Sequence, residues 1–147
     1  MTIFLTAIRP STDKAIDSMI ADYTKRMRRY TPIESTSHRS EEEFLRWLGR
    51  ERASKSTYAA LLDTRGKGLS SEAFAAEIDG VRASGRRQAV FAVGPHDGWS
   101  KDAIAAADLL LSLGPMTLPH QFARLVLAEQ VYRAFTILAG HPYHSGH

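Results

Sequence analysis

Cysteine is absent from the 147 residues, and this excludes disulfides, thiolate metal sites and cysteine nucleophiles together. Long apolar runs are also missing, since no stretch approaches the roughly 20 residues that a membrane helix requires. The N-terminal segment 1–10 lacks a basic leader, and its apolar run is typical of a strand rather than of a signal peptide. These absences predict a cytoplasmic protein without a membrane anchor.

Internal repeats and low-complexity linkers are missing as well, so we expect residues 1–147 to form one domain. Hydrophobic residues make up 44% of the chain and charged residues 24%, which is typical of a globular rather than a disordered protein. The formal net charge of +3 permits nucleic-acid binding but does not establish it. Neither a Gly-x-Gly-x-x-Gly fingerprint nor a phosphate-loop motif occurs, so an ordinary dinucleotide site is disfavoured.

Apolar runs of strand length alternate with segments of helical periodicity. Strands are expected at residues 2–8, 32–38, 57–62, 89–93 and 109–113. Helices are expected to begin at N-caps Ser11, Ser40 (in a capping box with Glu43) and Ser70, to run from about 100 to 107, and to cover 119–138. The alternation predicts an α/β fold with a mostly parallel sheet and helices on both faces. The last helix is apolar around much of its girth, so we expect it to be largely buried.

Glycine and proline gather after three of the expected strands, in the runs 63–68, 94–98 and 114–120. Open parallel sheets bind ligands at the carboxyl ends of their strands. Glycine lets the backbone approach a ligand closely, although any one of these runs could simply end a strand. Three such runs at one edge favour a site that holds a flat heterocycle through backbone groups.

Basic residues form two clusters on the expected helices. They are Lys25, Arg26, Arg28 and Arg29 on the first helix, and Arg46, Arg50, Arg52 and Lys55 on the second. Either cluster is a solvated face or an RNA-binding surface whose affinity would fall with salt. Trp47 and Trp99 are expected in packing rather than in base stacking. His141, His144 and His147 lack acidic or thiol partners, so no metal site is expected there.

The last third of the chain carries a distinctive set of motifs. They are Met116-Thr117-Leu118-Pro119-His120, Arg124, Leu127-Ala128-Glu129-Gln130, Tyr132-Arg133-Ala134 and His141-Pro142-Tyr143-His144. With them the chain resembles the bacterial RlmH-type 23S ribosomal RNA pseudouridine methyltransferases, which belong to the knotted SPOUT superfamily. The segments Leu62-Asp63, Gly66-Lys67 and 70–75 match the middle of that family. The resemblance covers the whole chain and is strongest from about residue 57 onward.

The resemblance implies a C-terminal trefoil knot, which no periodicity could indicate because knots are very rare. It implies a homodimer with each active site at the subunit interface. It also implies methyl transfer from S-adenosylmethionine to ring nitrogen three of a pseudouridine. The target would lie in an intersubunit helix of 23S ribosomal RNA, on the assembled ribosome.

Site residues follow from the same resemblance. It implies cofactor contacts by Leu62, Gly94, Leu113, Gly114, Pro115, Met116, Thr117 and Leu118. It implies RNA contact or catalysis by His120, Arg124, Tyr143 and His144. The target nitrogen must lose its proton, and we predict His144 as the general base, with His120 as the second candidate. Arg124 would hold a phosphate and Tyr143 would stack on a base, the alternatives being a surface arginine and a packed tail tyrosine.

Two positions depart from the family pattern. The middle loop, usually Gly-Gly-Pro-Glu-Gly, is here Gly94-Pro95-His96-Asp97-Gly98 preceded by Val93, and Ser145 stands where the family tends to have a basic residue. Three alternatives stay open. They are a SPOUT enzyme with another RNA target, a non-catalytic RNA-binding dimer and an unrelated nucleotide-binding protein, the last disfavoured by the missing phosphate motifs.

Overall fold

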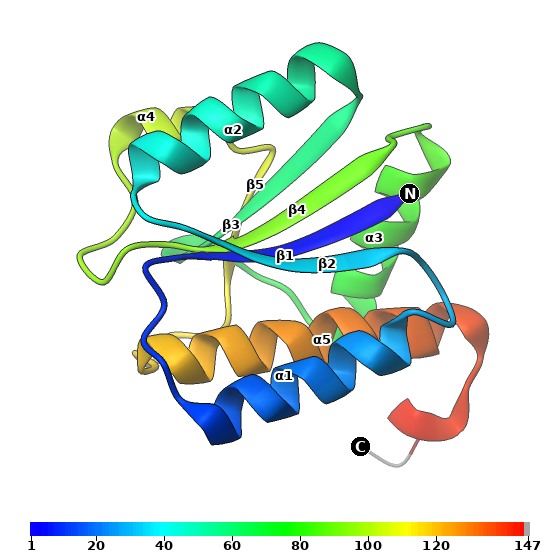
Figure 1. Cartoon of the computed structure of the whole chain (residues 1–147). Helices are drawn as coiled ribbons and strands as arrows, with labels where there is room; N and C mark the ends of the chain where they lie inside the picture. Colours follow the sequence, from blue (N-terminus) through cyan, green and yellow to red (C-terminus); the bar gives the residue numbers. More distant parts are fainter. Residues whose placement is uncertain (146–147) are drawn as a thin grey trace.

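A computed structural model describes residues 1–145 of the chain and shows a five-stranded, wholly parallel sheet in the order β2-β1-β4-β3-β5 (Figure 1). The strands are β1 (Thr2–Ile8), β2 (Ile33–His38), β3 (Thr57–Gly68), β4 (Gln88–Val93) and β5 (Leu109–Ser112). The helices are α1 (Lys14–Met27), α2 (Glu41–Ser54), α3 (Ser71–Ala83), α4 (Lys101–Ala106) and α5 (His120–Ala139), followed by the short 3₁₀ helix η1 (Pro142–His144). The predicted α/β class and the order of elements are confirmed.

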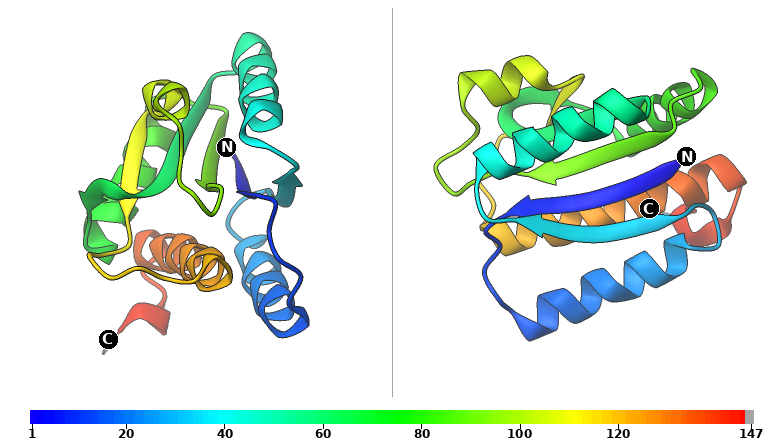
Figure 2. Two further views of the ribbon diagram at one scale, coloured as in Figure 1. Left: turned by 90° about the vertical axis from the view of Figure 1, so that its left-hand side faces the viewer. Right: turned by 45° about the horizontal axis from the view of Figure 1, so that its top comes forward.

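Helices cover both faces of the sheet, as the strand composition predicts (Figure 2). One core lies beneath α1, α3 and α5, and the other beneath α2 and α4. The central strands supply both cores by alternation, because successive side chains point to opposite faces. In β1, Ile3 and Leu5 enter the first core, whereas Phe4 and Ile8 enter the second. Burial on both faces is why these strands are apolar throughout.

Two helix starts differ in detail from the sequence prediction. Ser11 is not the N-cap of α1; the Asp13 carboxylate accepts a 3.1 Å hydrogen bond from the Ile16 amide instead. Asp and Ser cap equally well, so the sequence alone could not separate them. Ser40 caps α2 through the Glu43 amide as predicted, but the Glu43 carboxylate turns toward His38 and Arg39 instead of closing the capping box.

The third strand is longer than predicted. β3 does not end at residue 62 but shifts its register against β5 and continues to Gly68. Asp63 and Arg65 form a fork-like ion pair within this irregularity, and a Cβ on Gly66 would lie 2.5 Å from the Leu110 backbone. The expected loop is therefore a kinked strand, in which glycine allows the close approach to β5.

The last helix is buried only in its C-terminal part and not, as predicted, along most of its length. All seven buried residues of α5 lie from Leu127 onward. Phe122 in its first turn is 53% exposed, and Met116 and Leu118 just before it are exposed too. The strand order does not test the predicted knot, which stays a prediction.

Candidate functional site

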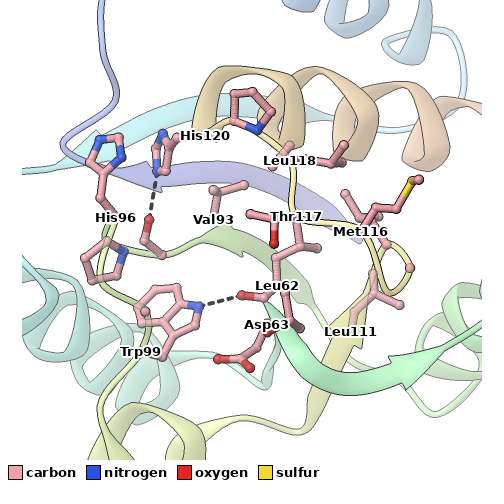
Figure 3. Close-up of a pocket in the computed structure, with 18 residues that line it drawn as sticks. Leu62, Asp63, Val93, His96, Trp99, Leu111, Met116, Thr117, Leu118 and His120 are labelled. Carbon is pink, nitrogen blue, oxygen red and sulfur yellow. Dashed lines mark hydrogen bonds between the residues drawn. The ribbon is translucent and has the colours of Figure 1, made fainter.

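The carboxyl ends of β3 and β4 meet the segment after β5 around a cavity of about 400 Å³ (Figure 3). The second and third Gly- and Pro-rich runs of the sequence meet here as predicted for a parallel sheet, whereas the first contributes only Asp63 and Thr64. The lining residues are Leu62, Asp63, Thr64, Val93, Gly94, Pro95, His96, Gly98, Trp99, Leu111, Leu113, Gly114, Met116, Thr117, Leu118, Pro119, His120 and Ala123. A volume of this size is within the range of small-molecule sites.

Seven of the eight residues predicted to contact a cofactor line this cavity, and Pro115 is the exception. They come from three separate parts of the chain, since Leu62 ends the regular part of β3, Gly94 follows β4, and the rest follow β5. Gly114 has a φ of +132°, a conformation that side chains rarely adopt, so the turn after β5 requires glycine.

Trp99 joins two walls of the cavity (Figure 3). Its indole N–H donates a 2.9 Å hydrogen bond to the Leu62 carbonyl. Its ring also lies so close to Gly94 that a Cβ there would fall 2.6 Å from an indole carbon. Trp99 is only 5% exposed, which confirms the prediction that it packs. The sequence does not reveal its second task, which is to fix the ends of β3 and β4 relative to each other.

Among the lining residues of the cavity, Asp63 carries the single carboxylate. Its side chain is 5% exposed and accepts hydrogen bonds from the Arg65 backbone amide and guanidinium. These bonds hold the pKa of Asp63 below its ordinary value, against the opposing effect of burial. Arg65 also reaches the Trp99 carbonyl at 3.3 Å, so the pair stabilises the same wall that Trp99 fastens.

His120 is the histidine that lies in this cavity together with His96. Its Nε2 is 2.7 Å from the Gly94 carbonyl, which can only accept, so Nε2 carries the hydrogen. In the neutral ring Nδ1 is then an acceptor, and this atom is buried without a partner among the described residues. Burial lowers the pKa of His120, and the charges of His96 and Arg124 lower it further, although the bond to Gly94 opposes them. His120 therefore presents a neutral acceptor.

Arg124 does not line the cavity. It forms a 3.2 Å ion pair with Asp17 of α1, its side chain is 15% exposed, and it faces a groove between α1 and β2. The phosphate contact of Arg124 stays a prediction. The alternative, a surface arginine, holds only in part, because the guanidinium already pairs with a carboxylate and is mostly covered.

Tyr143 is held against the end of α5 by side chains. Its hydroxyl donates a 3.1 Å hydrogen bond to Glu129, whose same oxygen accepts a 2.6 Å bond from Arg133. The Arg133 guanidinium lies 5.2 Å from the centre of the Tyr143 ring, and Tyr132 packs edge-on at 4.7 Å. Burial raises the pKa of Tyr143, so the hydroxyl keeps its proton. Tyr143 is thus packed on its own chain, as the alternative interpretation had it.

The tail does not line the cavity of its own chain. The cavity is at the N-terminal end of α5, and η1 follows the C-terminal end and folds back along the helix (Figure 1). Tyr143 contacts Glu129 and Tyr132 there, and no residue of η1 is among the lining residues of the cavity. His144, which we predict as the general base, therefore lies outside the cavity of its own chain. Its Nδ1 has no partner among the described residues.

Three residues of the cavity and the tail had no role in the sequence prediction. His96 stacks near His120 with ring centres 4.5 Å apart, and its place in a glycine-bounded loop was the available signal. Glu129 and Arg133 stood in the motifs without an assigned role. Their i, i+4 spacing indicates a helix-surface pair, but only the fold brings Tyr143 onto it.

Within residues 1–145, no three histidine, cysteine or carboxylate side chains gather as a metal ion would require, and His147 of the tail lies outside this range. No helix in the same part of the chain has the length and apolar character needed to cross a bilayer.

Comparisons with known proteins agree with this geometry. The family described as "Predicted SPOUT methyltransferase" matches residues 1–144. The ribosomal RNA large subunit methyltransferase H of Koribacter versatilis (strain Ellin345) is 42% identical over 140 residues, which cover 95% of either chain. The protein of the same name from Brucella ovis is 57% identical over 84 residues, covering 57% of this chain and 50% of its own.

Solved structures show the same fold. The SpoU methyltransferase AviRb from Streptomyces viridochromogenes aligns with a TM-score of 0.56 at 13% identity, over 95% of this chain and 61% of AviRb. Its complex with the cofactor AdoMet aligns with a TM-score of 0.51 over 90% of this chain and 57% of AviRb. Together with the family match and the relative that spans nearly the whole chain, the fold leads to one conclusion. The chain belongs to the SPOUT methyltransferases, in the family of the ribosomal RNA large subunit methyltransferase H.

Proposed function

We propose that this chain transfers a methyl group from S-adenosylmethionine to ring nitrogen three of a pseudouridine in large-subunit ribosomal RNA, in the cytoplasm and on the assembled ribosome. The observation that carries the proposal is the cavity at the ends of β3, β4 and β5, in a chain of this family. The name of its relatives supplies the ribosomal RNA as substrate class.

The cavity suits an adenosyl group. Its walls are backbone at Leu62, Gly94 and Gly114, and apolar side chains at Leu113 and Met116. Backbone donors and acceptors can recognise a heterocycle edge while apolar side chains cover its faces. The predicted set is completed by Thr117, Leu118 and Pro115, which would shape the loop over the ligand. S-adenosylmethionine supplies an already activated methyl group, so the task of these residues is to bind and orient.

Proton removal from the target nitrogen falls to a histidine. His120 offers an unpartnered, neutral Nδ1 inside the cavity wall. His144 of the partner subunit is the first candidate of the sequence prediction, and a homodimer would bring it to the site. In that arrangement one chain binds the cofactor and the other supplies the tail.

The exposed apolar side chains support the homodimer. Of the four large hydrophobic residues that are exposed among the described residues, three surround the start of α5: Met116 (82%), Leu118 (37%) and Phe122 (53%). An apolar patch beside a binding site is typical of an interface. The same patch borders the cavity, so a second copy seated on it would close the cavity and deliver its tail.

The test supplies radiolabelled S-adenosylmethionine and this protein to ribosomes that lack the modification, and then maps the labelled nucleotide. Label at a pseudouridine of the large-subunit RNA is the expected result. Label on another RNA or another atom would favour the first alternative of the sequence analysis. Binding of ribosomes without cofactor binding in a calorimetric titration would favour the non-catalytic dimer.

A further inference from the structure

The two basic clusters of the sequence differ in position, because only the cluster at the end of α1 lies on the same side of the sheet as the tail. We infer that the substrate RNA backbone crosses the cluster at the end of α1, formed by Lys25, Arg28 and Arg29, and that this cluster serves the cavity of the partner subunit. The inference rests on the proposed function, because it assumes that the tail acts in the other chain's site.

The α1 cluster is free to bind an anion. Residues 25–29 contain four basic residues and no acidic one. Lys25, Arg28 and Arg29 are exposed, and within the described residues none of the three lies within 4.0 Å of a carboxylate. Arg28 and Arg29 also border a hollow of about 500 Å³, where Glu34 is the single carboxylate of the lining. Unpaired cations of this kind are the sequence-independent contacts that RNA phosphates make.

The α2 cluster also has free cations, since Arg46, Arg50 and Lys55 are exposed and no carboxylate lies within 4.0 Å of them among the described residues. It differs from the α1 cluster in the acidic residues of its helix, in the pairing of Arg52 and in its position. The helix Glu41–Ser54 has four acidic residues against three basic ones. Arg52 is committed elsewhere, since it pairs with Asp108 at 2.9 Å and donates to the Ala106 carbonyl at 2.6 Å. The helix also covers the sheet face opposite α5 (Figure 2). A phosphate chain would meet mixed charge there and would lie away from the tail.

The end of α1 that carries the cluster is connected to the tail through Tyr132 of α5. Arg26 lies 5.9 Å from the centre of the Tyr132 ring, and Tyr132 packs on Tyr143, the residue before His144. Tyr23 packs against Tyr132 at 5.7 Å, so the end of α1 and the tail share one aromatic cluster. Any RNA that approaches the tail therefore passes the basic end of α1 of the same chain. The cofactor cavity of that chain is at the other end of α5.

The first experiment compares two triple variants that each remove one Lys and two Arg charges. Lys25→Gln/Arg28→Gln/Arg29→Gln removes the α1 cluster, and Arg46→Gln/Arg50→Gln/Lys55→Gln is the matched control on α2. Methylation of ribosomes is measured from low to high salt, with cofactor affinity and circular dichroism as checks on the cavity and the fold. We expect the α1 variant to raise KM for ribosomes about 10- to 100-fold and to lower the slope of log affinity against log salt by ~2–3.

The outcomes separate this inference from the proposed function. An unchanged KM in the α1 variant, or an equal rise in the control, would overturn the inference while methylation by the wild type still stands. Absence of methylation by the wild type would instead remove the proposed function. A kcat loss with unchanged KM and salt slope would also count against an RNA-binding cluster.

The second experiment asks which cavity the cluster serves. Gly94→Val, which pushes a side chain into the Trp99 ring, inactivates the cavity of one chain, and the α1 triple variant neutralises the cluster of the other. Each homodimer is measured alone, and then the two differently tagged chains are co-expressed and the heterodimer is purified. If the cluster serves the partner's cavity, the heterodimer has one intact composite site and regains about half of the wild-type activity per dimer at low ribosome concentration. No recovery would show that cluster and cavity act within one chain.

Discussion

The regions near the two ends of α5 differ in what their side chains contact. At its N-terminal end lies a cavity lined by glycines and apolar side chains, where the buried Nδ1 of His120 has no partner among the described residues. At its C-terminal end, Glu129, Arg133 and Tyr143 use their polar groups on one another. A cavity leaves room for a ligand, whereas a satisfied network fixes the position of what it holds. The comparison supports the proposal that the first end binds the cofactor and the second end positions the tail.

The largest effect on turnover is expected from removing His144 of the tail. His144→Ala should lower turnover about 10²–10⁴-fold, the usual contribution of a general base. Cofactor affinity should not change, because the tail packs on Glu129 and Tyr132 of α5 and does not line the cavity of its own chain. Single-turnover methylation and calorimetry measure the two quantities, and exposed Ser145→Ala is the control. Undiminished turnover would leave His120 as the candidate base.

A substitution at Gly94 should impair the cavity at the N-terminal end of α5 without touching the tail. In Gly94→Ala the new Cβ would meet the Trp99 indole at 2.6–2.7 Å. Overpacking of this kind costs about 1–3 kcal/mol of folding stability. Relief of the clash moves Trp99 or the Gly94 backbone in the cavity wall, so we expect weaker cofactor binding as well. Gly49→Ala on α2 is the control, since nothing lies within 4 Å of the position of its Cβ. Calorimetric titration with S-adenosylmethionine decides, and equal affinities in both variants would contradict the role given to this wall.

A smaller effect should follow when the tail network is loosened. Glu129→Gln removes the charge that Arg133 pairs with, and hydrogen bonds to charged groups contribute about 1.5–3 kcal/mol. We expect faster proteolysis of the tail and roughly 10-fold slower turnover, with cofactor affinity retained. Glu72→Gln at the exposed start of α3 serves as the control. If the tail stays resistant and turnover stays fast, the network does not fix the tail.

The smallest effect concerns pH. The folded-state pKa of His120 lies below its ordinary value, so the unfolded chain binds the proton more readily. The stability that His120 contributes is therefore complete above about pH 6.5 and is lost as the pH falls through the lowered pKa. Denaturant unfolding between pH 7.5 and 5 should show a shallower decline for His120→Gln than for the wild type. An NMR titration midpoint of His120 above 6.5 would contradict the sign.

The sequence predicted the strands and their arrangement better than the contacts that form only in the folded sheet. Strand positions followed from continuous apolar runs, because strands buried on both faces need apolar side chains throughout. The convergence of the second and third glycine-rich runs followed from parallel topology alone. The extension of β3 did not, because it depends on the Asp63–Arg65 pair and on Gly66 meeting Leu110, contacts made only in the folded sheet.

The tail shows a different limit. The resemblance gives roles in one site to residues of both 116–120 and 141–144. Within one chain the helix between them, predicted at 119–138, separates the two motifs. The exposed start of α5 was missed because apolar residues around a helix do not indicate which of them meet the core of their own chain.

The length of α5 sets both the distance of the tail from the cavity and its direction around the helix axis. One inserted residue would advance the tail by about 1.5 Å and turn it by about 100° around the helix axis. Seven inserted residues would nearly restore the direction of the tail but displace it by roughly 10 Å. Mutations that lengthen or shorten this helix should therefore be tolerated less well than equal changes in the loops, even where they touch no residue of either end.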